Sequence, residues 1–232
     1  MIISQNGNGK IHEVSIVQEA FLSKLTGQRV IIPAAGLGTR MGSPAAKELL
    51  PHPYYHMSFM EKALERVEKA GATPLVISRS DKGVLNSWLE EREVPHIQIE
   101  KTPEWVQSVW ASRHYWGKKN LLLLPDTEFS PENIMQEIFS NLETTELSIG
   151  MFSVENLSLW GGIKQEGERF FIAEKLSQSQ AGHAWGLIGF QGDSGESFWQ
   201  NYLAAQKTHE WTQVSQSVCL HQLEKFEDLT RG

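Results

Sequence analysis

Apolar residues along the chain follow two different patterns, and the two patterns alternate through its first half. Short apolar runs bounded by glycine, proline or polar residues predict buried strands at 29–35, 73–78, 96–100 and 120–126. Between these runs, apolar residues recur at helical spacing, which predicts helices over 58–70, 81–93, 103–116 and 131–143. Strands that alternate with helices are joined by right-handed crossovers, so this half predicts a mostly parallel sheet.

The boundaries of two of these helices are marked by specific residues. Ser58 is a predicted N-cap for the first helix, and Gly71 stands where that helix must stop. Asp81 is predicted to cap the next helix through its carboxylate.

The second half of the chain is richer in strands, which are expected at 146–154, 161–167, 169–176 and 183–192 before a helix over 196–211. Clustered strands predict a mixed region in which a second ligand would bind. Ligands of such sheets bind at the carboxyl ends of the strands, so the loops after Ile32 and Leu124 are expected on one rim. The predicted fold class is α/β: a Rossmann-like three-layer sandwich with a mostly parallel mixed sheet.

Residues 1–28 are interpreted as an N-terminal extension, with helical spacing over 14–25, and residues 29–232 as a single domain. The extension is predicted either to pack on this domain or to contact a second subunit of a homo-oligomer.

Composition narrows the classes of function. Hydrophobic residues make up 40% of the chain and charged residues 21%, which is typical of a globular protein. The net charge of -7 argues against a nucleic acid partner. A single cysteine, Cys219, excludes an internal disulfide framework and a cysteine metal cluster. The apolar runs are too short to cross a bilayer, and residues 1–13 lack the apolar core of a signal peptide, so a cytoplasmic location is expected.

The segment VIIPAAGLGTRMGSPAAKELLPH, residues 30–52, carries the strongest chemical signal. Gly36 and Gly38 follow a buried strand, where glycine lets backbone N–H groups approach an anion closely. Arg40 offers a planar fork for phosphate oxygens, and Lys47 adds a mobile point charge. Together these residues predict a cradle for a polyphosphate.

Two better-known glycine motifs do not fit this segment. A Walker A loop needs a lysine after its second glycine, but Ser43 follows Gly42. A dinucleotide fingerprint needs its third glycine where Met41 stands, and an acidic residue about 20 residues further on.

PAAGLGTRM and KELLP resemble the signature of the nucleotidylyltransferases of the nucleotide-diphospho-sugar transferase fold, a GT-A-like fold. The resemblance implies that Arg40 and Lys47 are catalytic. It also implies a nucleotide-binding segment formed by Ala34, Ala35, Gly36, Leu37, Gly38 and Thr39. The spacer before Lys47 is shorter than in the uridylyltransferases and closer to that of the cytidylyltransferases, and Ala46 replaces the usual proline.

LLLLPDTEF is similar to the family's apolar strand that ends in a metal-binding aspartate, which implies that Asp126 holds Mg²⁺. KFEDLTRG resembles the segment that supplies a second metal-binding aspartate, here Asp228. Glu128 is a rival second ligand.

LWGGIKQEGERFFIAEKL resembles the block that binds the acceptor. The resemblance implies a backbone contact to a sugar from Gly161, hydrogen bonds from sugar hydroxyls to Glu174, and a sugar phosphate facing Lys175. Trp185, in HAWGLIGF, either stacks on a sugar or base or fills the core.

QSVWAS is more like the start of a helix in the cytidylyltransferases than the Gly-rich stretch of the sugar nucleotidylyltransferases. Gln107 would read a base edge, and Ser108 would contact a ribose or base group. The identity of the base stays open.

The resemblance implies a magnesium-dependent nucleotidylyltransferase of nucleotide-sugar biosynthesis, which joins an NTP to a phosphorylated small acceptor. With a sugar 1-phosphate as acceptor, the products are an NDP-sugar and pyrophosphate. Three alternatives stay open: a cytidylyltransferase for an alditol phosphate or a phosphocholine-like molecule, a glycosyltransferase of the same fold, and a non-catalytic relative that binds nucleotide or sugar.

Overall fold

The computed structural model describes residues 11–13, 27–36 and 46–230. The chain divides into two compact units: the first comprises Met1–Lys118, Leu122–Thr127 and Asp228–Gly232, and the second Lys119–Leu121 and Glu128–Glu227. The helix expected at 14–25 lies outside the described residues. The division into an extension and one domain stays a prediction.

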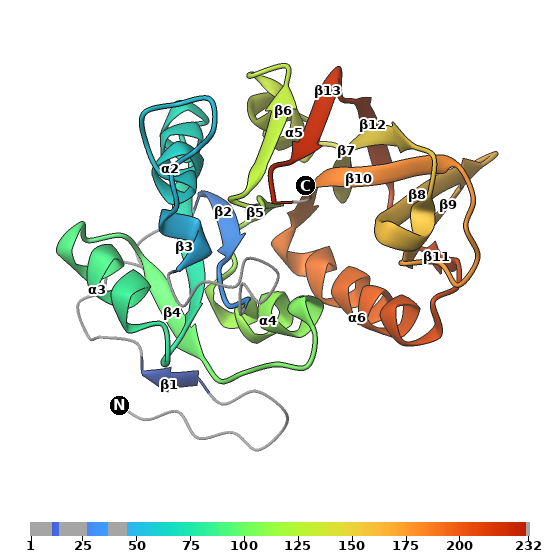
Figure 1. Cartoon of the computed structure of the whole chain (residues 1–232). Helices are drawn as coiled ribbons and strands as arrows, with labels where there is room; N and C mark the ends of the chain where they lie inside the picture. The colour runs from blue at the N-terminus through green and yellow to red at the C-terminus, as the bar shows by residue number, and fades with distance from the viewer. Residues whose placement is uncertain (1–10, 14–26, 37–45, 231–232) are drawn as a thin grey trace. The chain divides into compact units, whose positions relative to one another are not determined.

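Parallel strands form the centre of the first unit (Figure 1). They are β2 (Gln28–Pro33), β3 (Thr73–Arg79) and β4 (His96–Ile99), and β1 (Ile11–Glu13) pairs with β4 in the antiparallel sense. The predicted apolar runs supply the core of this sheet, because their central residues are buried: Val30, Ile31, Ile32, Leu75, Val76, Ile77 and Ile97. The parallel pairing predicted for these strands is confirmed.

The α-helices that accompany this sheet in the described part of the chain follow the order that the sequence predicts (Figure 1): α2 (Phe59–Lys69), α3 (Gly83–Glu91) and α4 (Trp105–Ala111). The described residues of this unit also form the short 3-10 helices η2 (Lys47–Leu49) and η3 (Arg113–Tyr115). The segment expected to form one helix over 103–116 is broken after Ala111: Ser112 N donates to Val109 O, three residues back, and the chain continues as the 3-10 helix η3.

Both boundary signals of α2 are confirmed. Ser58 Oγ accepts from Glu61 N at 3.2 Å, while Glu61 Oε2 accepts from Ser58 N at 2.7 Å, so the two residues form a capping box. Gly71 has a φ of 66°, a left-handed conformation that glycine adopts without steric cost, and its N–H donates to Glu68 O.

The cap predicted for the next helix is wrong. The N-cap of α3 is Lys82, which makes no side-chain cap hydrogen bond. Asp81 instead accepts from Arg79 Nε at 2.8 Å and pairs with Arg79 Nη2. Arg79 offers two donors to the two carboxylate oxygens, and such bidentate guanidinium–carboxylate pairs combine charge with matched geometry, so the arginine takes the carboxylate.

The second unit is built around β10 (Gly182–Gln191), which pairs in the antiparallel sense with β7 (Leu147–Val154) and β8 (Gly161–Glu166). From β8 the sheet continues through β9 (Arg169–Glu174) to β11 (Thr212–Val214), and β12 (Val218–Gln222) lies parallel to β7. The remaining elements are β5 (Lys119–Leu122), which borders β10, β6 (Thr127–Ser130), β13 (Lys225–Asp228), α5 (Ile134–Asn141), η4 (Leu157–Leu159) and α6 (Gly192–Thr208).

The strand expected over 120–126 ends earlier, at Leu122. Beyond it, Leu123 N still donates to Ile31 O at 3.0 Å, and the chain then enters β6, which pairs with β13. Pro125 interrupts the run because proline has no N–H to donate to a sheet. The predicted α/β fold class, a mixed sheet with parallel central strands and accompanying helices, is confirmed.

Candidate active site

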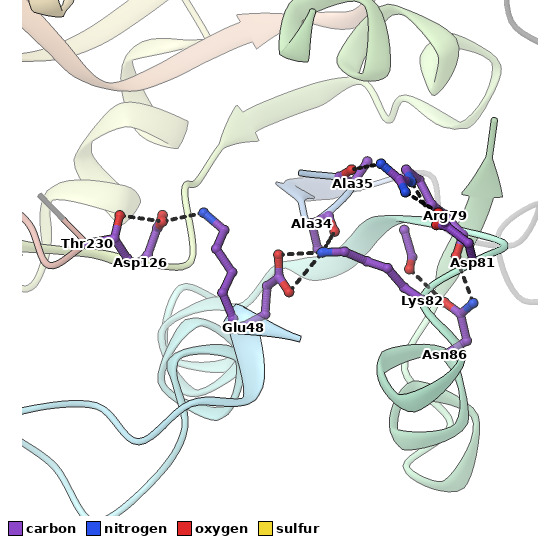
Figure 2. A network of polar contacts seen from close by, with 11 residues as sticks. Ala34, Ala35, Glu48, Arg79, Asp81, Lys82, Asn86, Asp126 and Thr230 are labelled. Atoms are coloured by element: carbon purple, nitrogen blue, oxygen red, sulfur yellow. Dashed lines mark hydrogen bonds and ion pairs between the residues drawn. The ribbon is translucent and has the colours of Figure 1, made fainter. Parts of the chain in front are cut away.

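The end of strand β2 is held in place by cations from the next part of the same unit. Ala34 N continues the strand by donating to Ile77 O at 2.8 Å. Ala34 O accepts from Lys82 Nζ at 2.6 Å, and Ala35 O lies 3.5 Å from Arg79 Nη1 (Figure 2). Gly36, which comes next, is exposed and has open space where a Cβ would stand.

Leu37, Gly38, Thr39 and Arg40 lie outside the described residues. Their predicted roles in gripping a triphosphate therefore stay predictions.

Lys47 and Asp126 meet although 79 positions separate them in the sequence. Lys47 Nζ lies 2.6 Å from Asp126 Oδ2, and both side chains are largely buried. Burial alone would lower the pKa of Lys47, but the charge of Asp126 and its hydrogen bond outweigh that effect and raise the pKa. Lys47 is therefore a cation at neutral pH, close to the carboxylate that the sequence nominates as a metal ligand.

The C-terminal segment brings the second predicted ligand to the same place. Thr230 Oγ1 lies 3.3 Å from Asp126 Oδ2 (Figure 2). The same hydroxyl lies 2.8 Å from Asp228 Oδ1. Leu229 N also donates to Asp126 O at 2.9 Å. Two carboxylates therefore flank one hydroxyl, although they come from segments far apart in the sequence.

These oxygens fit a magnesium ion in their chemistry. Mg²⁺ is a hard cation that protein sites commonly bind through one or two carboxylates, with phosphate and water oxygens as its other ligands. Asp126 and Asp228 would supply the two carboxylates, and magnesium binding at this place stays a prediction. Within the described part of the chain, histidine, cysteine and acidic side chains form no group of three or more suited to a metal. The rival ligand Glu128 is a buried residue of β6.

Sequence reasoning missed a second ion pair of this site. Lys82 Nζ lies 2.9 Å and 3.0 Å from the two carboxylate oxygens of Glu48, in addition to its bond to Ala34 O (Figure 2). The Glu48 side chain is fully buried. Glu48 follows Lys47 in η2, so Lys82 joins the end of β2 to the short helix that carries Lys47. A charged residue inside the apolar context of KELLP was the available signal.

The predicted acceptor residues of the second unit are also brought together. Trp185 Nε1 donates to Tyr202 Oη at 2.7 Å, and Tyr202 Oη donates to Glu174 Oε2 at 2.6 Å. A Cβ on Gly161 would overlap the indole nitrogen of Trp185 and lie 2.6 Å from Tyr202 Oη. Tyr202, in α6, was not among the predicted residues, because its spacing within that helix indicates only a core position.

Three other predicted residues, Lys175, Gln107 and Ser108, lie outside these two polar clusters. Lys175 is exposed and has a φ of 50°. Gln107 Oε1 accepts from Glu104 N at 3.4 Å, and Ser108 Oγ donates to Trp105 O at 2.6 Å. Both hydrogen bonds belong to the first turn of α4. The proposed contacts of these residues with base, ribose or acceptor stay predictions.

No helix among residues 11–13, 27–36 and 46–230 is both long and apolar enough to span a membrane. No protein-family model and no curated protein sequence matches the chain. Comparison of structures, by contrast, finds many matches. They show that the chain has the nucleotide-diphospho-sugar transferase fold of nucleotidylyltransferases, so the predicted resemblance is confirmed at the level of the fold.

Three of the matching structures illustrate the likeness. A candidate glucose-1-phosphate thymidylyltransferase of Bacillus anthracis, in complex with sucrose, superposes with a TM-score of 0.66 at 15% identity, over 88% of this chain and 90% of its own. HddC of Yersinia pseudotuberculosis superposes with a TM-score of 0.63 at 16% identity, over 87% of this chain and 93% of its own. UDP-glucose pyrophosphorylase of Acinetobacter baumannii gives 0.62 at 14% identity, over 88% of each chain.

Proposed function

We propose that this protein is a nucleotidylyltransferase that joins an NTP to a sugar 1-phosphate and releases pyrophosphate. The observation that carries the proposal is the ion pair between Lys47 and Asp126. It lies in the same polar network as the end of β2, because Lys82 connects Ala34 O to Glu48, the neighbour of Lys47. A triphosphate needs a cation near its phosphates, and its divalent counter-ion needs a carboxylate. The pair offers both groups near the carboxyl end of a strand, where ligands of such sheets bind.

The names of the structural neighbours support the same class and suggest the acceptor. Two of the matching proteins are called a glucose-1-phosphate thymidylyltransferase and a UDP-glucose pyrophosphorylase. A further structure of the second kind contains UTP. The substrate matrix described below identifies the base of the NTP and the sugar of the acceptor.

In the proposed reaction, an oxygen of the acceptor phosphate attacks the α-phosphorus of the NTP. A new P–O bond forms there, and the bond from the α-phosphorus to the oxygen that bridges to the β-phosphate breaks, so pyrophosphate leaves with the electron pair. The nucleophile is already an anion, and no general base is needed. Catalysis then consists of alignment and of neutralising the repulsion between two anions.

The chain's own residues would share this task. Lys47 would leave Asp126 for the α-phosphate, where negative charge accumulates in the transition state. Arg40 would bind the β- and γ-phosphates, and backbone N–H groups of 36–39 would donate to phosphate oxygens. Asp126 and Asp228 would hold Mg²⁺, which when bound supplies Lewis-acid neutralisation of the phosphates.

The test is a matrix of four NTPs against phosphorylated acceptors, with released pyrophosphate as the readout. The acceptors should include sugar 1-phosphates, an alditol phosphate and phosphocholine. Lys47→Ala and Asp126→Ala are each expected to reduce turnover by about 10²–10³-fold or more while the fold survives. Lys207→Ala, which removes an exposed lysine of α6, is the matched control and should retain wild-type rates.

The same matrix separates the alternatives. Turnover of a nucleotide-sugar without pyrophosphate chemistry would indicate a glycosyltransferase instead. Tight binding of NTP without turnover of any pair would indicate a non-catalytic relative. Near-wild-type rates in folded Lys47→Ala would contradict the assignment of the site.

A further inference from the structure

The second unit contains a chain of three buried polar groups that connects its main helix to the predicted acceptor residue. Trp185 Nε1 donates to Tyr202 Oη at 2.7 Å, and Tyr202 Oη donates to Glu174 Oε2 at 2.6 Å. Tyr202 is fully buried, and Glu174 has only 4% of its surface exposed. Hydrogen bonds between buried polar groups are stronger than those between exposed groups, because no water competes for the donors and acceptors.

The two hydrogen bonds run in one direction, from the indole to the phenol and from the phenol to the carboxylate. The indole N–H can only donate, so Tyr202 Oη must accept from Trp185. Tyr202 Oη then donates its single proton to Glu174 Oε2. Burial, the charge of Glu174 and the bond to its carboxylate together raise the pKa of Tyr202 well above its usual value, so the phenol keeps this proton.

The backbone around Glu174 is held as well. Glu174 O lies 3.0 Å from His209 Nδ1, just beyond the C-terminal end of α6, and Lys175 N donates to Trp160 O at 3.0 Å. Lys175 then takes a left-handed conformation, with a φ of 50°. Both parts of Glu174 are therefore held: Tyr202 of α6 contacts its side chain, and His209 at the C-terminal end of α6 contacts its main-chain oxygen.

Packing leaves little room for another arrangement. Trp185 and Tyr202 stand directly over Gly161, where any side chain would overlap the indole. The two rings meet at 76° with centroids 6.3 Å apart, a favourable edge-to-face geometry. The indole and the phenol therefore stay in register with the carboxylate.

From this geometry we propose that Tyr202 is a positioning residue for acceptor recognition: its hydroxyl fixes the Glu174 carboxylate in the orientation that accepts hydrogen bonds from the sugar hydroxyls. This inference rests on the proposed function. Tyr202 itself does not touch the substrate; it acts through Glu174, and Trp185 acts through Tyr202.

Tyr202→Phe tests the proposal, because it removes one oxygen and keeps the ring that fills the core. The KM of the acceptor should rise about tenfold, the equivalent of one lost hydrogen bond to a charged group. The KM of the NTP should change less than about twofold. Trp185→Phe, which removes the N–H that orients the phenol, should change the acceptor KM in the same direction but less. Tyr54→Phe, an exposed tyrosine, serves as the control.

Deoxy acceptors give a readout that a merely structural role would not affect. The panel consists of monodeoxy sugar 1-phosphates, each of which lacks one hydroxyl. The acceptor that lacks the hydroxyl donating to Glu174 should be used equally well by wild type and Tyr202→Phe. If the variant is impaired equally with every acceptor, or lowers only the Tm, the proposal is wrong.

Calorimetry of sugar 1-phosphate binding separates this inference from the proposed function. About tenfold weaker binding to Tyr202→Phe supports the positioning role even if no NTP is turned over. Equal binding to both proteins overturns the role while leaving the proposed function intact. If no phosphorylated sugar binds the wild type, both are overturned.

Discussion

The buried ion pair between Lys82 and Glu48 allows a quantitative prediction for the substitution Lys82→Met. The ammonium of Lys82 faces three oxygens: Ala34 O at 2.6 Å and the Glu48 carboxylate at 2.9 Å and 3.0 Å. The side chain of Glu48 is 0% exposed and that of Lys82 is 11% exposed. Methionine resembles lysine in length but carries no donor, so the substitution leaves a carboxylate buried without its counter-ion.

The size of the effect follows from this burial. Removing one partner of a buried ion pair costs about 3–5 kcal/mol of unfolding free energy, and the donor lost from Ala34 O moves the value toward the upper end. For a chain of this length, 1 kcal/mol corresponds to about 2–4 °C, so the Tm should fall by about 6–20 °C. The KM of the NTP should also rise, because the end of β2 and η2 lose their connection.

Thermal and urea unfolding of four proteins would test this reasoning. Lys69→Met is the matched control: it breaks a pair with Glu65 at 2.7 Å on the exposed face of α2, which should cost at most about 0.5 kcal/mol. The double variant Lys82→Met/Glu48→Met replaces both charges by apolar groups and should recover most of the lost stability. If Lys82→Met is as stable as Lys69→Met, or the double variant is no better than the single one, the pair does not have the role assigned to it.

Three further predictions concern other parts of the chain. Gly161→Ala should lower stability by about 1–3 kcal/mol or more in urea unfolding and raise the acceptor KM, because its Cβ displaces Trp185; unchanged values of both would contradict the observed packing. Ser58→Ala should cost about 1 kcal/mol at pH 7. Hydrogen bonds from the Ser58 backbone and side chain lower the pKa of Glu61, so their stabilisation is present above the ordinary pKa of glutamate and lost as the pH falls through the lowered one; the gap between wild type and variant should therefore shrink at acid pH. Burial raises the pKa of the Cys219 thiol, so iodoacetamide should alkylate the native protein more slowly at pH 8 than the urea-unfolded chain, and equal rates would refute this.

Several features of the fold could be predicted because their causes are local. Ser58 and Gly71 mark the ends of α2 through backbone geometry and capping, which act over a few residues. Local reasoning failed where a competing partner stood nearby. Asp81 was expected to cap α3, yet the N-cap is Lys82, and Arg79, two residues before Asp81, takes its carboxylate.

The candidate site was predicted in part. The motif after the first strand nominated Lys47, the separate segment LLLLPDTEF nominated Asp126, and the structure shows that the two side chains meet. Glu48 and Lys82 were missed, because charged residues usually lie in solvent, and no periodicity distinguishes a buried pair from two exposed charges.

By itself, the sequence determined the alternation of strands and helices, the parallel central strands and the residue types that could handle a triphosphate, because periodicity and strand-end motifs are properties of neighbouring residues. Only the tertiary structure decided which of those residues act together. Lys47 with Asp126, Lys82 with Glu48, and Tyr202 with Glu174 lie 79, 34 and 28 positions apart. Such partners are chosen by which segments the fold brings together and by the cost of burying a charge without a counterpart, and neither can be read from a local pattern.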